Sequence, residues 1–232
     1  MNFDSFRVMS FDCYGTLIDW ETGILDALSP LRSLSSRDTT DDELLELYAT
    51  AESRIQSGEY RKYRDVLRLV TADVAAALGV AAGRYDPDAL PDSIAGWRPF
   101  PDTVDSLSRL KRRYELVVLS NIDDDIFAKT ALRLGVTFDH VITAEQAQSY
   151  KPSHNNFHLV LERIGRQRHE VLHVAQSLFH DIKPARELGI ATVWVNRRGG
   201  REGGGATYPA EARPDLEVPD LASLVRLVEQ SS

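Results

Sequence analysis

The chain has 232 residues, of which 43% are apolar and 27% charged, which is typical of a globular protein with one sizeable core and room for a smaller domain. Its net charge of −8 argues against a nucleic-acid partner, and the single cysteine, Cys13, excludes an intramolecular disulfide and suits a reducing compartment. Because no apolar run reaches the length of a signal-peptide core or a membrane span, we expect a cytoplasmic protein with no membrane partner.

The first predicted strand, RVMSF at residues 7–11, is followed by a long segment without strand patterns. That segment, from about 20 to 97, instead has apolar residues at helical spacing in DDELLELYATAESRIQ (41–56) and VLRLVTADVAAALGV (66–80), separated by the polar stretch SGEYRKYRD. It is too long for a single crossover between neighbouring strands. We therefore predict an inserted helical domain at residues 20–97.

The rest of the chain alternates strands with helices. It begins with WRPFPDTV, in which Asp102 is the expected N-cap of the next helix. Helical patterns then alternate with predicted strands. The helices are expected at 103–113, 124–134, 153–165 and 181–188, and the strands at 115–120, 140–144, 171–175 and 191–195. A glycine-rich segment (197–214), expected to be a mobile loop, precedes a short edge element and a closing helix in 215–230. This order predicts an α/β fold, a Rossmann-like parallel sheet with helices on both faces, built from residues 1–19 and 98–232.

Polar side chains follow the carboxyl ends of the predicted strands, where an open parallel sheet places its chemistry. Taken singly, these residues could be helix caps, turn formers or exposed loop residues. Their joint occurrence predicts a nucleophilic carboxylate, a lysine and a second carboxylate in one crevice. The residues are Asp12 after the first strand, Ser120 and Asn121 after the second, Lys151 after the third, and Ser177, His180 and Asp181 after the fourth.

Four stretches resemble, in order, the motifs of the haloacid dehalogenase-like hydrolase superfamily. They are FDCYGTLID (11–19), LSN (119–121), the lysine of SYKPS (149–153), and AQSLFHDIKPARELGI (175–190) with TVWVNR (192–197). The resemblance covers essentially the whole chain and implies that residues 20–97 are the cap domain of such enzymes. It also implies that Asp12 is a nucleophile that forms a covalent ester or acyl phosphate.

Two positions resemble the dehalogenase branch of the superfamily, the L-2-haloacid (type II) enzymes, more than its phosphatases. Phosphatases carry a second Asp two residues after the nucleophile and a Gly-Asp pair in the fourth motif that helps to hold Mg²⁺. Here Tyr14 and the pair Ala175-Gln176 occupy those positions. The resemblance therefore implies a metal-independent displacement, without a cofactor, at a carbon next to a carboxylate.

The resemblance also implies roles for the candidate residues. Asp12 would attack carbon, Lys151 would keep Asp12 ionised, and Asp181, paired with Lys151, would orient or activate the water that hydrolyses the ester. Cys13 is expected to pack in the core. The expected substrate-binding residues are Tyr14, Gly15 and Thr16 (through their backbone N–H groups or hydroxyl), Ser120, Asn121, Ser177, His180 and Trp20, which could also pack between the domains.

One departure concerns the leaving group. A dehalogenase is expected to bind the halide with an arginine on the cap, but Tyr48, Ala49 and Thr50 occupy the matching stretch. No spacing argument selects Arg54, Arg61 or Arg64 as a substitute. An Asn expected after the fourth strand is likewise replaced, by Leu178.

Three function classes stay open at this point. The first is a metal-free hydrolase acting on a small carboxylate, either an (S)-2-haloacid or a strained cyclic amino acid such as L-azetidine-2-carboxylate. The second is a Mg²⁺-dependent phosphatase, and the third is a non-catalytic binding or regulatory protein. An exposed apolar face of the cap could pair two chains into a homodimer.

Overall fold

The computed structural model describes residues 1–200 and 205–231. Its parallel strands form one sheet in the order β3-β2-β1-β4-β5-β6. The strands are β1 Val8–Phe11, β2 Glu115–Ser120, β3 His140–Thr143, β4 Val171–Ala175, β5 Ala191–Val195 and β6 Leu216–Val218. The predicted Rossmann-like α/β fold is confirmed, and the expected edge element is β6. Residues 201–204, within the glycine-rich segment expected to be mobile, lie outside the described residues.

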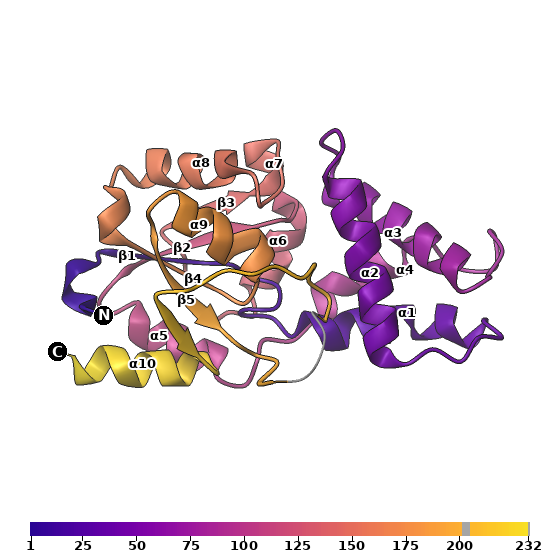
Figure 1. The fold of residues 1–232 in the computed structure, drawn as a ribbon, viewed down its shortest axis with the longest axis horizontal. Coiled ribbons are helices and arrows are strands. Elements are labelled where there is room, and N and C mark those ends of the chain that lie inside the picture. Colours follow the sequence, from indigo (N-terminus) through magenta and orange to yellow (C-terminus); the bar gives the residue numbers. More distant parts are fainter. Residues whose placement is uncertain (201–204, 232) are drawn as a thin grey trace.

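Helices cover both faces of this sheet, with α5 (Thr103–Leu110) and α10 (Leu221–Gln230) on one side and α8 (His154–Ile164) and α9 (Lys183–Glu187) on the other (Figure 1). Successive strand residues alternate between the two sides: Met9 and Val118 belong to the core under α5 and α10, whereas Val8 and Val117 belong to the core under α8. Each of these fully buried side chains contributes about 1.5–3 kcal/mol. The continuous apolar strands are explained by this double coverage.

Residues 20–97, which we call the cap, form a group of helices to one side of the sheet (Figure 1). The cap helices are α1 (Trp20–Ser33), α2 (Asp41–Gln56), α3 (Tyr63–Ala77) and α4 (Ala89–Ser93). The two connections to the core run side by side, because Asp19 N donates to the carbonyl of Arg98 (2.8 Å) and Ile18 pairs with Pro99. Within the described residues, no helix has the length and apolar character needed to cross a membrane.

Helix α3 begins at Tyr63, three residues before the apolar pattern that predicted it. Its N-cap residue, Lys62, makes no side-chain capping bond. Instead, the carboxylate of Asp123, at the end of β2 in the core, accepts hydrogen bonds from Tyr63 N (2.9 Å) and Arg64 N (3.1 Å). A core residue thus caps a helix of the cap and ties the two parts together.

Asp102 is the N-cap residue of α5, as predicted, but its side chain serves another helix. Its side chain makes no capping bond to α5. Instead it accepts hydrogen bonds from the backbone N–H groups of Leu221 (2.7 Å) and Ala222 (3.3 Å) in the first turn of α10, and it pairs with Arg197 (2.8 Å). The closing helix is therefore anchored by a residue far away in sequence.

Candidate active site

Asp12, Lys151 and Asp181 meet in a buried cluster at the carboxyl ends of β1, β2 and β4. The ammonium Nζ of Lys151 donates to Oδ1 of Asp12 (2.9 Å), Oδ1 of Asp181 (2.7 Å) and the carbonyl of Leu119 (2.9 Å). Lys151 is 1% exposed, so all three of its N–H groups are used inside the protein. The expected pairing of Lys151 with Asp181 is confirmed, and its bond to Asp12 completes a bridge between two carboxylates.

Both oxygens of Asp12 accept a hydrogen bond. Oδ1 accepts from the ammonium group of Lys151, and Oδ2 accepts from the hydroxyl of Thr16 (2.6 Å). The same hydroxyl accepts a hydrogen bond from Gln176 N (2.9 Å). Burial raises the pKa of Asp12 and the nearby Asp181 adds to this, whereas Lys151 and Thr16 act in the opposite direction. Lys151 thus favours the ionised form of Asp12, as expected, without cancelling the effect of burial. The pKa of Lys151 itself is raised, because the two carboxylates outweigh its burial.

Asp181 lies in a π-helical turn, Leu178–Ile182, and α9 begins only at Lys183. The helix predicted at 181–188 is therefore present, but it starts earlier, with the π-helical turn, and becomes α-helical only at Lys183. Ser177 begins this turn, since its Oγ accepts a hydrogen bond from His180 N (2.9 Å). Burial would raise the pKa of Asp181, but Lys151 and then His173 outweigh it and lower that pKa.

His173 is a site residue that the sequence reasoning missed. It is fully buried in β4, with Nε2 at 3.0 Å from Oδ1 of Asp181 and Nδ1 at 2.8 Å from Oγ of Ser10. It contacts the same oxygen of Asp181, Oδ1, that accepts from Lys151. The sequence did contain a signal for this residue: His173 is the one polar side chain in the otherwise apolar strand VLHVA. A buried polar group of this kind needs a hydrogen-bond partner.

These carboxylates face a cavity of about 30 Å³, enough for two or three water molecules, since one water needs about 10–15 Å³. All of the predicted site residues except Gly15 and Thr16 line it, together with Glu52 and Tyr63 of the cap. Both parts of the chain therefore line the cavity.

Gly15 shapes the cavity without lining it. Its φ of +94° suits glycine, and a Cβ there would lie 2.7 Å from the indole Nε1 of Trp20. The N–H of Gly15 donates to the carbonyl of Ile18 (2.9 Å), so the expectation that this group holds the substrate is wrong. The Tyr14 hydroxyl likewise has a partner, Oγ1 of Thr130 at 2.8 Å.

Two polar atoms of this cavity are left without a partner. Among the described residues, neither the hydroxyl of Ser120 nor Oδ2 of Asp181 has a hydrogen bond, although both side chains are 1% exposed. Asn121 is used differently: its side chain accepts from Lys151 N (2.7 Å) and donates to Lys151 O (3.1 Å), which positions the lysine loop. A ligand can thus still engage one donor, Ser120, and one acceptor, Asp181.

The cap contributes Glu52, which was also missed. Its Oε1 accepts hydrogen bonds from the hydroxyls of Tyr63 (2.6 Å) and Tyr48 (3.0 Å), and Trp20 packs edge-on against Tyr48. Burial raises the pKa of Glu52 to about 7, with Asp12 adding to the effect and the two tyrosines opposing it. The sequence signal for Glu52 was its position one helical turn after Tyr48, which places a charged residue on the apolar face of α2.

None of the arginines considered as substitutes lines this cavity. Arg54 pairs with Asp73, Arg64 pairs with Asp92 (2.6 Å), and Arg61 is exposed. On the cap side, the cavity is therefore lined by the carboxyl group of Glu52 and by Tyr63, and by none of these arginines.

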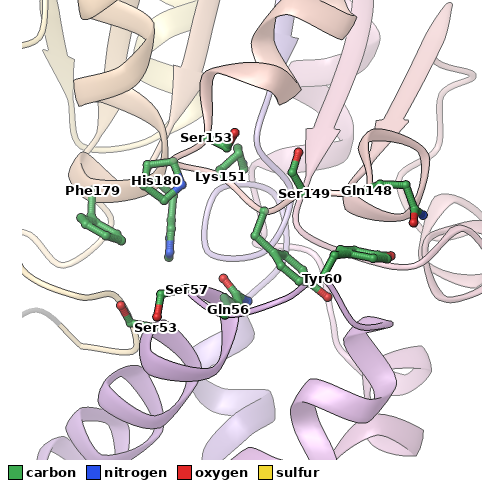
Figure 2. A pocket seen from close by; sticks show the side chains of 13 residues that line it. Ser53, Gln56, Ser57, Tyr60, Gln148, Ser149, Lys151, Ser153, Phe179 and His180 are labelled. Atoms are coloured by element: carbon green, nitrogen blue, oxygen red, sulfur yellow. The ribbon is translucent and has the colours of Figure 1, made fainter.

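A larger cavity of about 390 Å³ lies between the cap and the core (Figure 2). Figure 2 shows Ser53 and Gln56 of the cap facing Phe179 and His180 of the core. Lys151 and His180 line both cavities, so we infer that the larger one is the approach to the smaller. Burial lowers the pKa of His180 to about 4, so its imidazole adds no charge there at neutral pH.

The amino-acid sequence matches the haloacid dehalogenase-like hydrolase family over residues 6–189. The chain belongs to this family. It is 30% identical to the (S)-2-haloacid dehalogenase of Pseudomonas sp. strain YL over 99% of this chain and 97% of that one. It is also 35% identical to the glyceraldehyde 3-phosphate phosphatase of Methanocaldococcus jannaschii, over 49% of this chain and 54% of that one.

Solved structures agree with the family assignment at the level of the fold. The L-2-haloacid dehalogenase from Xanthobacter autotrophicus with chloropropionic acid covalently bound superposes with a TM-score of 0.80 at 22% identity, covering 98% of this chain and 100% of that chain. The predicted family and the hydrolase class are thereby confirmed, whereas the residue roles and the substrate stay predictions.

The residues of this hydrolase do not fit the Mg²⁺ site of the family's phosphatases. The Lys151 ammonium already lies between the carboxylates of Asp12 and Asp181. Tyr14 supplies no carboxylate, and the Gln176 side chain accepts from the hydroxyl of Thr207 (3.3 Å). Within residues 1–200 and 205–231, no group of three His, Cys, Asp or Glu side chains could hold a metal ion.

Replacing Glu52 with Gln is expected to stabilise the hydrolase increasingly as the pH rises. Because the pKa of Glu52 is raised from its usual 4.5 to about 7, the folded chain keeps a proton that the unfolded chain loses in this window. Its ionisation therefore removes stability between pH 4.5 and pH 7, by about 3 kcal/mol in full. In urea unfolding, the advantage of Glu52→Gln over the wild type should grow by about 2–3 kcal/mol from pH 5 to pH 8. An advantage that does not change with pH would contradict the raised pKa.

Proposed function

We propose that this hydrolase displaces a leaving group from the carbon next to a carboxylate, through a covalent ester at Asp12. The observation that carries the proposal is the bridge in which Lys151 joins Asp12 to Asp181 at a small cavity between core and cap. Such an arrangement offers an ionised oxygen nucleophile and a second carboxylate beside it. Tyr14, in the position of the phosphatases' second Asp, offers no carboxylate as acid or base for phosphoryl transfer.

In the first step, a carboxylate oxygen of Asp12 attacks the substrate carbon from the side opposite the leaving group. The new bond joins that oxygen to the carbon, and the bond to the leaving group breaks with its electron pair. Lys151 and Thr16 hold the Asp12 carboxylate in place. The unpartnered hydroxyl of Ser120 is the donor available to the substrate carboxylate.

In the second step, water attacks the carbonyl carbon of the Asp12 ester. The unpartnered Oδ2 of Asp181 is the acceptor that orients this water, because Oδ1 is already held by Lys151 and His173. The ester bond breaks, one proton of the water passes to the product oxygen and the other is released to solvent. The product leaves as a 2-hydroxy acid, and Asp12 regains its carboxylate with one oxygen from water. Because the pKa of Asp181 is lowered, its carboxylate is better suited to orient the water by accepting a hydrogen bond than to retain a proton taken from that water.

The comparison with the Pseudomonas relative supports the (S)-2-haloacids as substrates, because that relative is named for this activity and matches along nearly its whole length. A strained cyclic amino acid such as L-azetidine-2-carboxylate is the second candidate, and Glu52 favours it. The Mg²⁺-dependent phosphatase and the non-catalytic alternative receive no support from the site. A cytoplasmic location, a homodimer and the absence of a cofactor stay predictions from the sequence.

Isotope labelling tests the proposal. In ¹⁸O-water with EDTA, repeated turnover of (S)-2-chloropropionate or L-azetidine-2-carboxylate should place heavy oxygen in the peptide that contains Asp12. With enzyme in excess and a single turnover, the label should enter Asp12 and not the product, because the product oxygen comes from the unlabelled carboxylate. If Asp12 stays unlabelled while a phosphate ester is hydrolysed after Mg²⁺ is restored, the hydrolase is a phosphatase. Ligand binding without any turnover would indicate the non-catalytic class.

A further inference from the structure

We propose that Glu52 makes the leaving-group end of the cavity a binding site for a protonated amine. The inference rests on the displacement at Asp12 proposed above and narrows its substrates. The preferred class is then a small carboxylate whose leaving group is the ammonium nitrogen of a strained ring, with Glu52 as the counter-ion of that nitrogen.

The first support is the environment of Glu52. Its carboxyl lies on α2 of the cap, 4% exposed, and lines the same cavity as Asp12 of the core. The hydrogen bonds it receives come from the hydroxyls of Tyr48 and Tyr63, which are neutral donors. A buried carboxylate without a cationic partner is costly, so a cationic ligand group beside Glu52 would be strongly favoured.

The second support is the charge of the cavity walls. Among the described lining residues, three carboxyl groups, Asp12, Asp181 and Glu52, face a single cation, Lys151, which Asp12 and Asp181 already share. An anion such as a haloacid adds to this excess of negative charge, whereas a zwitterion brings a positive group with it. The halide end of a haloacid would also gain negative charge beside Glu52 as its bond breaks.

The chemistry of the ring opening balances without a further reactant. At the start, the ring nitrogen carries two protons and a positive charge. Asp12 then attacks the adjacent carbon, the carbon–nitrogen bond breaks, and the electron pair of that bond stays on the nitrogen. The nitrogen leaves as a neutral primary amine, still joined to the substrate through the opened ring, and later takes a proton from solvent. Glu52 keeps the nitrogen in the protonated form that can leave, and ring strain provides the driving force.

A matched pair of ligands measures the ammonium site without turnover. L-Proline carries an unstrained ring ammonium, and (S)-tetrahydrofuran-2-carboxylate places an uncharged oxygen at the same position. By calorimetry, the wild type should bind L-proline at least tenfold more tightly than the oxygen analogue, and Glu52→Gln should remove this preference. Glu46→Gln is the control, because Glu46 is exposed on the same helix and loses the same charge.

The pH dependence of this binding provides a second readout. Affinity for L-proline should rise as the pH passes about 7 in the wild type, where Glu52 ionises, and should change much less in Glu52→Gln. The other titratable groups facing the same space are Tyr14, Tyr48, Tyr63, Asp12, Lys151, Asp181 and His180. Of these, His180 has its pKa lowered to about 4, below this window.

Turnover completes the test. Relative to the wild type, Glu52→Gln should lower the ratio of kcat/KM for L-azetidine-2-carboxylate to that for (S)-2-chloropropionate by at least thirtyfold, mainly through KM. The proposed amine site would be contradicted if Glu52→Gln lost the same factor in kcat/KM for both substrates. It would also be contradicted if the wild type bound the two ring analogues equally well. If chloride were then released from (S)-2-chloropropionate and Asp12 became labelled with heavy oxygen, the displacement at Asp12 would still be supported. If Asp12 stayed unlabelled with every substrate, the displacement itself would be contradicted.

Discussion

Asp12→Asn is expected to abolish turnover, with a loss on the order of 10⁴-fold or more, as for other catalytic nucleophiles. The amide keeps the size of the side chain and can accept from Lys151, but it is a far poorer nucleophile than a carboxylate. Folding should be retained, because the substitution removes one negative charge from a cluster with two carboxylates and one ammonium group. Product formation measures the loss of turnover, and urea unfolding measures whether the variant folds.

The matched control is Asp38→Asn, which changes an exposed aspartate of the cap and should retain wild-type turnover. A second check is the isotope experiment, in which the Asp12→Asn protein should take up no heavy oxygen at residue 12. If this variant kept more than a few per cent of the activity, Asp12 would not be the nucleophile, and direct attack by a water held at Asp181 would be the better description.

Lys151→Met should cost both activity and stability. Without the ammonium group, the buried carboxylates of Asp12 and Asp181 lose the cation between them, and removing one partner of a buried ion pair costs about 3–5 kcal/mol. Turnover should fall on the order of 10³-fold, because Asp12 then tends to take up a proton and lose its nucleophilic form. Urea unfolding and initial rates measure the two effects.

The stability loss of Lys151→Met should also depend on pH. In the variant, the pKa of Asp12 rises further above its unfolded value, so the stability difference from the wild type is smallest at low pH and grows as the pH rises. Lys129→Met, an exposed change on α6 (Asp124–Ala131), controls for the loss of a charge. A loss below about 1 kcal/mol at pH 8 would contradict the bridging role of Lys151.

The two ends of the cavity differ in origin. Asp12, Lys151 and Asp181 come from the sheet, where the carboxyl ends of neighbouring parallel strands converge. Glu52, Tyr48 and Tyr63 come from the cap. If the proposed division holds, the sheet supplies the displacement and the cap selects the leaving group, so changes in α2 and α3 can alter specificity without altering the nucleophile.

By itself, the sequence determined the strands of the sheet, the inserted helical segment and the residues at the strand ends. These features are local: apolar runs of the right length form buried strands, and polar residues directly after them must lie at one edge of a parallel sheet. Lys151 does not directly follow its strand, because α7 (Ala144–Ala147) comes between β3 and the loop of Lys151. Its position near Asp12 was predicted from the place of that loop after the third strand and from the resemblance to the family.

Only the tertiary structure decided which partners meet across the domains and through the core. Asp123 caps α3, Asp102 anchors α10, and His173 supports Asp181, in each case through a contact that local periodicity does not encode. Glu52 appeared in the sequence as one more charged residue on an amphipathic helix. Its burial against two tyrosines depends on how α2 packs against α3 within the cap, and its pKa and the charge of the cavity follow from that packing.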